Sequence, residues 1–525
     1  MLRSICPSQD FNIASCNNMR PVALFVPYLH YIMMKALPFG RKIFAYVICL
    51  TLCILLCSCR KQSAYEGDAE LEFSTLTVAF DTVFTSLSSV TERLVVTNPY
   101  DGDVYTDVLL QGGDASFFSV NVNGVPGGRQ KHVCIPARDS IFVFVKVNLH
   151  PNGQDTPLLV VDTLHFFTNG KRQDISLLAS GQDAHFIVAD RAVGGIPYRI
   201  VAGEGEHTVW KNDKPYVIYG YAVVDSTGRL DIEAGTQVYV HRDGGLWVYK
   251  GGCLKVKGTK DEPVVFQGDR REAFFRKDYA QWSRIWINEG TEDNVIDHAV
   301  IRNAFIGIQA EILDEDMGNR LRLSNCLIEK SSGIGFLGRG YRVEAWNNVF
   351  SDCGQYALAL VQGGDYTFAH NTVYNYYTQG VRKTPSVFFS NYYDVGNVRY
   401  LSDFTADFTD NIIYGSQPRE FAFSFLPQAK FTAGLHDGLL RCDTVYPEVF
   451  GNNLRRDVDP GLQDPRNGNF VPKENSPCNA AGVYLPAYPC DRAGNFRPDP
   501  PAVGAYEYAA PEETSSRYMN RKNQR

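Results

Sequence analysis

The sequence predicts an all-β protein in which an N-terminal β-sandwich is followed by a parallel β-helix, a solenoid of stacked coils. Two observations support this prediction. Short alternating strands are separated by turns rich in Gly, Pro and Asn, and a short motif recurs in the C-terminal half at a spacing mostly in the twenties. The composition agrees, since 45 Gly, 29 Tyr and 32 Phe in 525 residues are typical of a β-rich chain with many turns. A chain of this length needs more than one compact core.

A secretory leader is predicted close to the N-terminus. It begins at Met34 with the cationic stretch MKALPFGRK and continues into IFAYVICLTLCILL, an apolar run of 14 residues. A membrane-spanning helix needs about 20 residues, so this run is too short for one. Residues 1–33 show no pattern that export requires, and we therefore expect translation to start at Met34 and a signal peptide to cover 34–58. An uncleaved signal anchor is the alternative.

The end of the leader, Leu56-Cys57-Ser58-Cys59, resembles a bacterial lipobox, in which a small residue precedes the cysteine that is lipidated. Cys59 is the predicted lipid attachment site, with Cys57 as the alternative, and 59–70 would be a tether. Each buried CH₂ of an acyl chain contributes about 0.8 kcal/mol, so two or three chains hold a protein firmly on a membrane. The predicted location is the cell envelope, as an outer-membrane lipoprotein. Whether it faces the surface or the periplasm stays open.

The next segment, 71–185, is predicted to form the sandwich. Seven short strands such as ERLVVTN and SIFVFVKVNL are separated by turns such as NGVPGG, at the roughly 8 to 12 residue spacing of an all-β sandwich. The segment resembles the Ig-like modules that precede larger domains in Bacteroidetes lipoproteins, although it has no Cys-Trp-Cys signature. The expected role is a spacer between the membrane and the C-terminal domain.

Five repeats of a polar residue, a variable residue and two large apolar residues predict the coils of the β-helix. Their starts are separated by 27, 22, 24 and 40 residues, and the longest gap is read as containing an insertion over 382–403. Four of the five lead residues are Asn, and stacked Asn side chains can hydrogen-bond from one coil to the next. The lead residues are His298, Asn325, Asn347, Asn371 and Asn411.

Sequence motifs on both sides of the repeats resemble the pectin-lyase-like, right-handed parallel β-helix family. Upstream these are AQWSRIWI and VIDHAVIRN, and downstream DVDPGLQDPRNGNFVPKENSPCNAAG and GAYEY, which resemble the closing segment of many bacterial β-helix proteins. The resemblance implies a right-handed β-helix over 190–508, with caps at 190–220 and 457–508. The polar stretch 509–525 is expected to be a disordered tail. In AQWSRIWI, Trp282 and Trp286 are expected to share one face and to pack inside a coil.

Cysteine placement and net charge restrict the ligands. Cys478 and Cys490 are the candidate disulfide of an oxidising compartment, while Cys326 and Cys353 fall in apolar strands and are expected to be small buried residues. No Cys/His pattern has zinc spacing, so we predict no metal site and no cofactor, with Ca²⁺ as the exception if the protein is a lyase. The formal charge of −7 argues against nucleic acid as a partner.

The best candidate for a glycan groove lies between 338 and 383, where aromatic rings for sugar faces and cations for carboxylates or sulfates occur together. Ordinary solvated residues on turns are the alternative reading. Enzymes on this fold mostly cut polysaccharides along one sheet, but none of their active-site motifs matches here, so catalytic residues stay unknown. The candidate glycan contacts are Arg339, Arg342, Tyr376, Tyr377, Arg382 and Lys383.

Three functions are therefore carried forward. The leading hypothesis is a cell-envelope lipoprotein whose β-helix binds a polysaccharide or another extended ligand. The second is a polysaccharide lyase or glycoside hydrolase that uses the same groove, and the third is a structural or adhesive surface protein. Fold alone does not decide between them.

Overall fold

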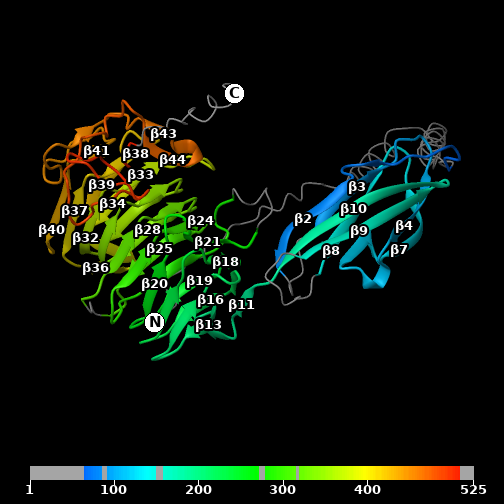
Figure 1. The fold of residues 1–525 in the computed structure, drawn as a ribbon, viewed down its shortest axis with the longest axis horizontal. Helices are drawn as coiled ribbons and strands as arrows, with labels where there is room; N and C mark the ends of the chain where they lie inside the picture. Colours follow the sequence, from blue (N-terminus) through cyan, green and yellow to red (C-terminus); the bar gives the residue numbers. More distant parts are fainter. Residues whose placement is uncertain (1–63, 85–90, 149–157, 271–277, 315–317, 509–525) are drawn as a thin grey trace, which may run out of the picture.

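The computed structural model describes residues 64–84, 91–148, 158–270, 278–314 and 318–508 (Figure 1). The predicted all-β architecture, a sandwich followed by a parallel β-helix, is confirmed in these ranges. The leader, Cys59 and the tail 509–525 lie outside the described residues. No helix in the described part of the chain is long and apolar enough to cross a membrane.

The sandwich consists of two five-stranded sheets that share one apolar core. All pairings are antiparallel except that of β2 with β10. Alternate side chains of a strand such as VYTDVLL are buried, as expected for a sheet with one face against a core. One sheet has the order β1 (Glu72–Phe73), β3 (Glu92–Thr97), β8 (Ser140–Val147), β5 (Phe118–Val122), β6 (Val125–Pro126); the other β2 (Thr77–Phe84), β10 (Lys171–Gln182), β9 (Leu158–Thr168), β4 (Val104–Leu110), β7 (Arg129–Ile135).

The β-helix consists of three long sheets, and each coil contributes one strand to the ten-stranded, then the nine-stranded, then the eleven-stranded sheet. The ten-stranded sheet holds β12 (Arg191–Val193), β13 (Ile196–Ala202), β16 (Tyr221–Val224), β19 (Gly245–Val248), β22 (Arg284–Ile287), β25 (Ile306–Glu311), β28 (Ile334–Arg339), β31 (Tyr356–Val361), β34 (Val387–Ser390) and β39 (Phe421–Ser424). The nine-stranded sheet holds β14 (His207–Trp210), β17 (Arg229–Ile232), β20 (Cys253–Lys257), β23 (Asn294–Asp297), β26 (Leu321–Ser324), β29 (Arg342–Trp346), β32 (Gly364–Ala369), β37 (Phe404–Thr409) and β40 (Phe431–His436). The eleven-stranded sheet holds β11 (His185–Val188), β15 (Tyr216–Tyr219), β18 (Gln237–Val240), β21 (Val264–Gly268), β24 (Ala299–Arg302), β27 (Leu327–Glu329), β30 (Val349–Ser351), β33 (Thr372–Asn375), β38 (Ile412–Gly415), β41 (Leu439–Leu440) and β42 (Arg455–Arg456).

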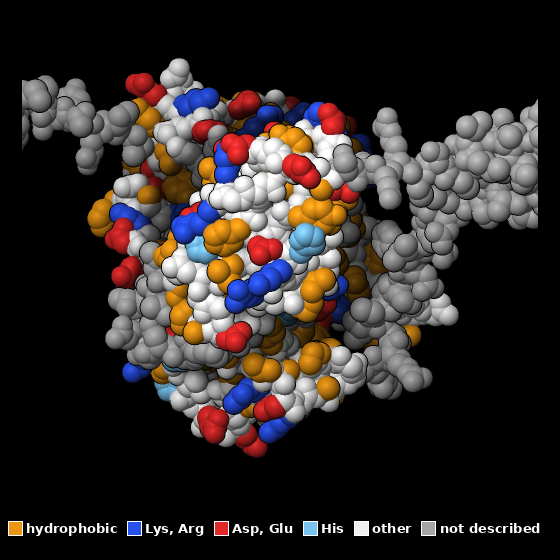
Figure 2. Space-filling view, turned by 90° about the vertical axis from the view of Figure 1, so that its right-hand side faces the viewer, with side chains coloured by type: hydrophobic (Ala, Val, Ile, Leu, Met, Phe, Trp, Pro, Cys, Tyr) orange, Lys and Arg blue, Asp and Glu red, His pale blue; other side chains and the backbone are white. Residues whose placement is uncertain are grey.

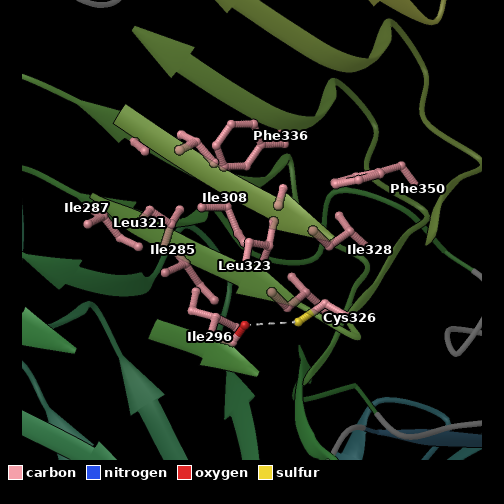
Figure 3. Close-up of a cluster of buried hydrophobic side chains, with 14 of the residues drawn as sticks. Ile285, Ile287, Ile296, Ile308, Leu321, Leu323, Cys326, Ile328, Phe336 and Phe350 are labelled. Carbon is pink, nitrogen blue, oxygen red and sulfur yellow. Dashed lines mark hydrogen bonds between the residues drawn. The ribbon is translucent and has the colours of Figure 1, made fainter. Parts of the chain in front are cut away.

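Strand alternation divides each coil into an apolar interior and an outer face. In β22, Ile285 and Ile287 point inward and are fully buried, and they stack on the equivalent residues of neighbouring coils (Figure 3). Burying one such aliphatic side chain contributes about 1.5–3 kcal/mol. Cys326 and Cys353 are confirmed as small buried residues of this core, and the Cys326 thiol lies 3.5 Å from the Ile296 carbonyl (Figure 3).

One left-handed residue follows the strand of the nine-stranded sheet in six consecutive coils, from His298 to Asp437. In three of these coils an Asn comes directly after it, and the three Asn side chains form a ladder. His370 has φ 53° and Asp410 has φ 57°. The Asn371 Oδ1 atom accepts hydrogen bonds from the Asn348 backbone and side-chain amides, both at 2.9 Å, and Asn411 repeats this one coil later. The predicted repeat alignment is therefore wrong by one residue at Asn371 and Asn411, because His370 and Asp410 occupy the turn position that Asn325 and Asn347 hold in their coils.

The two predicted caps differ from the structure. Most of 190–220 already belongs to the first coil, β13 to β15, and the strands that precede it are β11 and β12. The C-terminal segment does not close the solenoid end. It packs along the outer face of the eleven-stranded sheet, where Leu462, Phe470 and Val503 bury Val349 and Ile412, whereas Tyr446, Phe450 and Leu454 pack on the terminal core. This segment contains the hairpin of β43 (Leu462–Asp464) and β44 (Asn469–Pro472).

Two further expectations need correction. The insertion is shorter than the predicted 382–403, because β34 within that range belongs to a coil. The inserted residues form the hairpin of β35 (Tyr392–Val395) and β36 (Val398–Leu401). The candidate disulfide is not formed: Cys478 and Cys490 are free thiols, and Cys478 is buried within hydrogen-bond distance of the Pro460 carbonyl at 3.4 Å.

Candidate functional site

The outer face of the ten-stranded sheet carries a row of aromatic and polar side chains in its N-terminal half. Trp247 on β19 and Trp286 on β22 are register partners, and their rings stack with centroids 4.5 Å apart and an interplanar angle of 9°. The Tyr249 ring meets the Trp247 ring edge-on at 5.5 Å. Because β19 and β22 pair in parallel without a register shift, residues at matching positions of the two strands lie side by side on the same face of the sheet. The residue types at these positions therefore determine the row. We call Trp247, Tyr249, Arg284, Trp286 and Gln309 the aromatic face.

Hydrogen bonds fix the rings of the aromatic face. The Trp247 indole N–H donates to Asn288 Oδ1 at 2.8 Å, and the Trp286 indole N–H donates to Glu311 Oε1 at 2.7 Å. Tyr249 is 38% exposed and Trp247 is partly exposed, whereas Trp286 is nearly buried by its neighbours. A ligand therefore meets the edges of a preorganised row, which lowers the entropic cost of ordering on binding.

Cations line the same face. The Arg284 guanidinium lies 6.0 Å from the Trp286 ring centroid and donates to Gln309 Oε1 at 2.5 Å. Two coils beyond Arg284, Arg339 on β28 pairs with Glu311, donates to Gln362 Oε1 at 3.1 Å, and lies 4.5 Å from the centroid of Tyr393 on the β35–β36 hairpin. The predicted residue Arg339 thus belongs to this face, but its guanidinium is largely engaged within the fold.

The hairpin covers the C-terminal half of this sheet. Tyr393 packs with a small apolar cluster on the outer side of β25, β28 and β31, which includes Ile306, Leu337 and Val361. The aromatic face therefore ends where the hairpin begins.

Two buried carboxylates, that of Glu311 on this face and that of Glu289 two residues beyond β22, are held in hydrogen bonds that organise the structure. Glu311 accepts from Trp286 and Arg339, and Glu289 accepts from the backbone amides of Leu313 and Asp314 at 2.8 and 3.2 Å. A catalytic acid or base needs an oxygen that can exchange a proton with a ligand. The arrangement therefore suits ligand recognition better than proton transfer.

The remaining predicted contacts are dispersed. Arg342 begins β29 of the nine-stranded sheet and is exposed beside its register partner Asp365. Tyr376 stacks on Tyr374 of the eleven-stranded sheet at 4.8 Å, and Lys383 is exposed on the following turn. The predicted residues thus do not form one groove.

Arg382 needs a correction as a glycan contact, because its side chain is 1% exposed. It pairs with the fully buried Glu420 at 2.5 Å and donates to the Asn375 carbonyl at 3.1 Å. Glu420 also accepts from the Ser386 backbone and hydroxyl at 3.0 and 2.5 Å. Arg382 therefore fastens a turn between coils.

Tyr377 lies on the same turn, in a small polar cluster with Tyr279 and Asp352. The two tyrosine rings meet edge-on at 5.1 Å, and the Tyr279 hydroxyl lies 3.1 Å from Thr378 Oγ1. Burial raises the pKa of Asp352, although a hydrogen bond with Tyr279 opposes the shift. In the described ranges, no three His, Cys, Asp or Glu side chains are grouped as a metal site would require.

The sequence prediction missed the tryptophans of the aromatic face. Trp282 is buried in the core as expected, but Trp286 lies on the outer face. The two residues were expected on one face because they are four positions apart, but Trp282 precedes β22, so only Trp286 follows the alternation of the strand. The signal available was the shared position of Trp247 and Trp286 in successive coils.

Figure 2 shows the end of the molecule at which the sandwich faces the viewer, and charges of both signs are interspersed there without a continuous field of one sign. Such a distribution gives no long-range attraction to a polyanion at this end of the molecule.

No protein-family model and no curated protein sequence matches the chain. Among solved structures, it is similar to a protein of unknown function from Porphyromonas gingivalis W83, with 14% identity over 25% of this chain and 58% of that one, at a TM-score of 0.17. A family 123 glycoside hydrolase from Clostridium perfringens shares 7% identity over 23% and 30%, and a PapD-like domain of human CEP192 shares 9% over 24% and 91%, both at a TM-score of 0.17. The chain spans less than two thirds of the first two proteins, and likenesses this low carry no functional argument.

Proposed function

We propose that the protein is a cell-envelope lipoprotein whose β-helix binds a polysaccharide along the aromatic face. The observation that carries this proposal is the stacked pair of Trp247 and Trp286 beside Arg284, on an outer face that the coils build without interruption. Aromatic rings contact the apolar faces of sugars, while guanidinium and amide groups bond to hydroxyls and carboxylates. The assignment to right-handed, pectin-lyase-like lipoproteins of the Bacteroidetes type, with an Ig-like N-terminal domain, belongs to the same proposal.

The test is binding of the full chain, purified in detergent, to a panel of acidic and neutral polysaccharides. Trp247→Ala is expected to weaken binding about tenfold or more, the effect of losing an aromatic anchor worth about 1.4 kcal/mol or more. Tyr484→Ala is the matched control, since Tyr484 is 37% exposed and lies on the C-terminal segment, away from this sheet. Equal binding by all three proteins would contradict the proposal and favour the structural or adhesive alternative.

Membrane attachment through Cys59 is a separate part of the proposal. Cys59→Ala is expected to move the protein from the membrane fraction to the soluble fraction, because the variant lacks the acyl chains. Membrane fractionation unchanged from the wild type would contradict lipidation at this residue.

A lyase or hydrolase is the second candidate, and Asp352 is the observation that favours it. A partly buried carboxyl with a raised pKa beside a tyrosine is a candidate general acid. Turnover of a bound polysaccharide that disappears in Asp352→Asn would establish it. Binding without turnover in both proteins would leave recognition as the function.

A further inference from the structure

The N-terminal end of the described chain is fastened to one end of the sandwich. Residues 64–71 run beside the turn that follows β3 and the hairpin between β9 and β10. The Tyr65 ring stacks on the Tyr100 ring with centroids 4.1 Å apart. The Asn169 side chain, on the hairpin, donates to the Tyr65 and Gly67 carbonyls at 2.9 and 2.8 Å. We call this the hairpin end of the sandwich.

Further contacts hold the same segment to the sandwich as far as β1. The Glu70 backbone amide donates to the Tyr100 hydroxyl at 3.0 Å. Leu71 exchanges two hydrogen bonds with the Gln173 side chain, at 2.9 and 3.0 Å, and the side chains of Ala69 and Leu71 are buried in the sandwich core. The part of the expected tether that the structure describes therefore packs on the sandwich.

The β-helix is attached at the opposite end of the sandwich. β10 starts beside the hairpin and runs for 12 residues to Gln182. Only Asp183 and Ala184 separate it from β11, which pairs with the first coil of the β-helix. At about 3.3 Å per residue, β10 places its two ends about 36 Å apart. In Figure 1 the hairpin end accordingly lies at the right and the β-helix at the left.

We propose that the hairpin end of the sandwich faces a lipid surface, with the β-helix carried on the side away from it. This inference rests on the proposed lipidation of Cys59 and adds which surface of the protein meets the membrane. Only the four residues 60–63 separate Cys59 from Ala64. Five residue steps span at most about 18 Å even when fully extended. The hairpin end therefore stays close to the headgroups, because this reach is about half the length of β10.

The side chains of the hairpin end suit the headgroup level of a membrane rather than its interior. Glu66 is exposed, and the side chains of Asp68 and Asp101 are 84% and 88% exposed. Carboxylates are costly in hydrocarbon, so this end rests on the lipid surface without inserting, and the acyl chains provide the attachment. The exposed acids also disfavour anionic lipids, and the partner that fits is a lipid surface without net charge.

The experiment places a fluorescent amino acid at Glu66 or at Val193 in the full chain, which is purified in detergent and reconstituted on phosphatidylcholine vesicles that carry a nitroxide on the headgroup. Val193 is the control position, since it is 39% exposed and lies on β12 of the β-helix. We expect the nitroxide to reduce the fluorescence at Glu66 and to leave that at Val193 unchanged. Equal loss at both positions would overturn the orientation. Failure to associate with the vesicles would overturn the lipid anchor and, with it, this inference.

A longer tether tests the cause of the orientation. About 20 Gly and Ser residues inserted between Ser63 and Ala64 add about 25 Å on average to the reach of the anchor. This variant is expected to associate with the vesicles as before but to lose most of the quenching at Glu66. The matched control carries the same insertion directly after Tyr508, beyond the β-helix, and should be quenched like the unmodified chain. Undiminished quenching at Glu66 with the longer tether would overturn the proposal that the short tether holds this end at the membrane.

Discussion

Asp410→Asn is expected to stabilise the β-helix at neutral and alkaline pH. Asp410 is fully buried under the C-terminal segment, where its two oxygens accept from the Val483 amide at 3.1 and 3.0 Å. His370 Nδ1 lies 3.7 Å away, and burial lowers the pKa of His370 to about 2, so the imidazole is neutral. Burial raises the pKa of Asp410 to about 7 from its ordinary 3.8. A charged Asp410 is therefore disfavoured in the folded state.

The sign and size of the effect follow from proton linkage. Below pH 3.8 the Asp410 carboxyl is protonated in both states, and its contribution to stability is fully present. Between 3.8 and about 7 only the unfolded state loses the proton, so stability falls by about 1.4 kcal/mol per pH unit. The interval spans about 3 pH units, which gives a loss on the order of 4 kcal/mol that is complete above pH 7. Asn at this position stays neutral, keeps an acceptor for Val483 and can donate to His370.

The assay is urea unfolding of the wild type and Asp410→Asn at pH 4 and pH 8, following the transition of the β-helix rather than that of the sandwich. The variant should match the wild type at pH 4 and exceed its free energy of unfolding at pH 8 by up to about 4 kcal/mol. Asp443→Asn is the control, since Asp443 is an exposed partner of Arg419 and its loss should change the free energy of unfolding little at either pH. A variant destabilised equally at both pH values would refute the reasoning.

Two further predictions concern buried charges. Arg382→Ala leaves Glu420 buried without its cation, so the free energy of unfolding should fall by about 3–5 kcal/mol. Urea titration measures this change, and a loss below about 1 kcal/mol would contradict the structural role of the pair. Burial opposes the ionised form of Asp231, but hydrogen bonds from Arg229 and Lys257 outweigh it and lower its pKa to about 2. Its stabilising effect is therefore present above pH 3.8 and lost as pH falls through about 2, so acid unfolding of Asp231→Asn should show a weaker pH dependence than the wild type in that window.

The repeat could be predicted from the sequence because every coil must bury apolar side chains at alternate positions, whatever its turns contain. The turn residue was less predictable. A left-handed conformation is accessible to Asn, Asp and His alike, and His370 and Asp410 hold it where Asn325 and Asn347 hold it in other coils. An alignment on Asn alone therefore selects Asn371, the following ladder residue, and slips by one position.

The site was less predictable than the fold, because composition does not say which side of a coil a residue faces. Arg382 and Arg339 occur in the same aromatic-basic segment, yet the first is enclosed by Glu420 and the second lies at an outer face. Arg339 ends the strand β28, whereas Arg382 lies on a turn between β33 and β34, so different coils set their environments. Trp286 shows the same limit, since its side is set by where β22 begins.

Two segments that leave the coils determine which outer faces of the β-helix a ligand can reach. The C-terminal segment covers the eleven-stranded sheet from β27 to β41, and the β35–β36 hairpin covers the ten-stranded sheet over β25, β28 and β31. Among the described residues, neither segment packs on the aromatic face of β19 and β22. The N-terminal half of the ten-stranded sheet, rather than the segment 338–383, is therefore where the proposed recognition is expected.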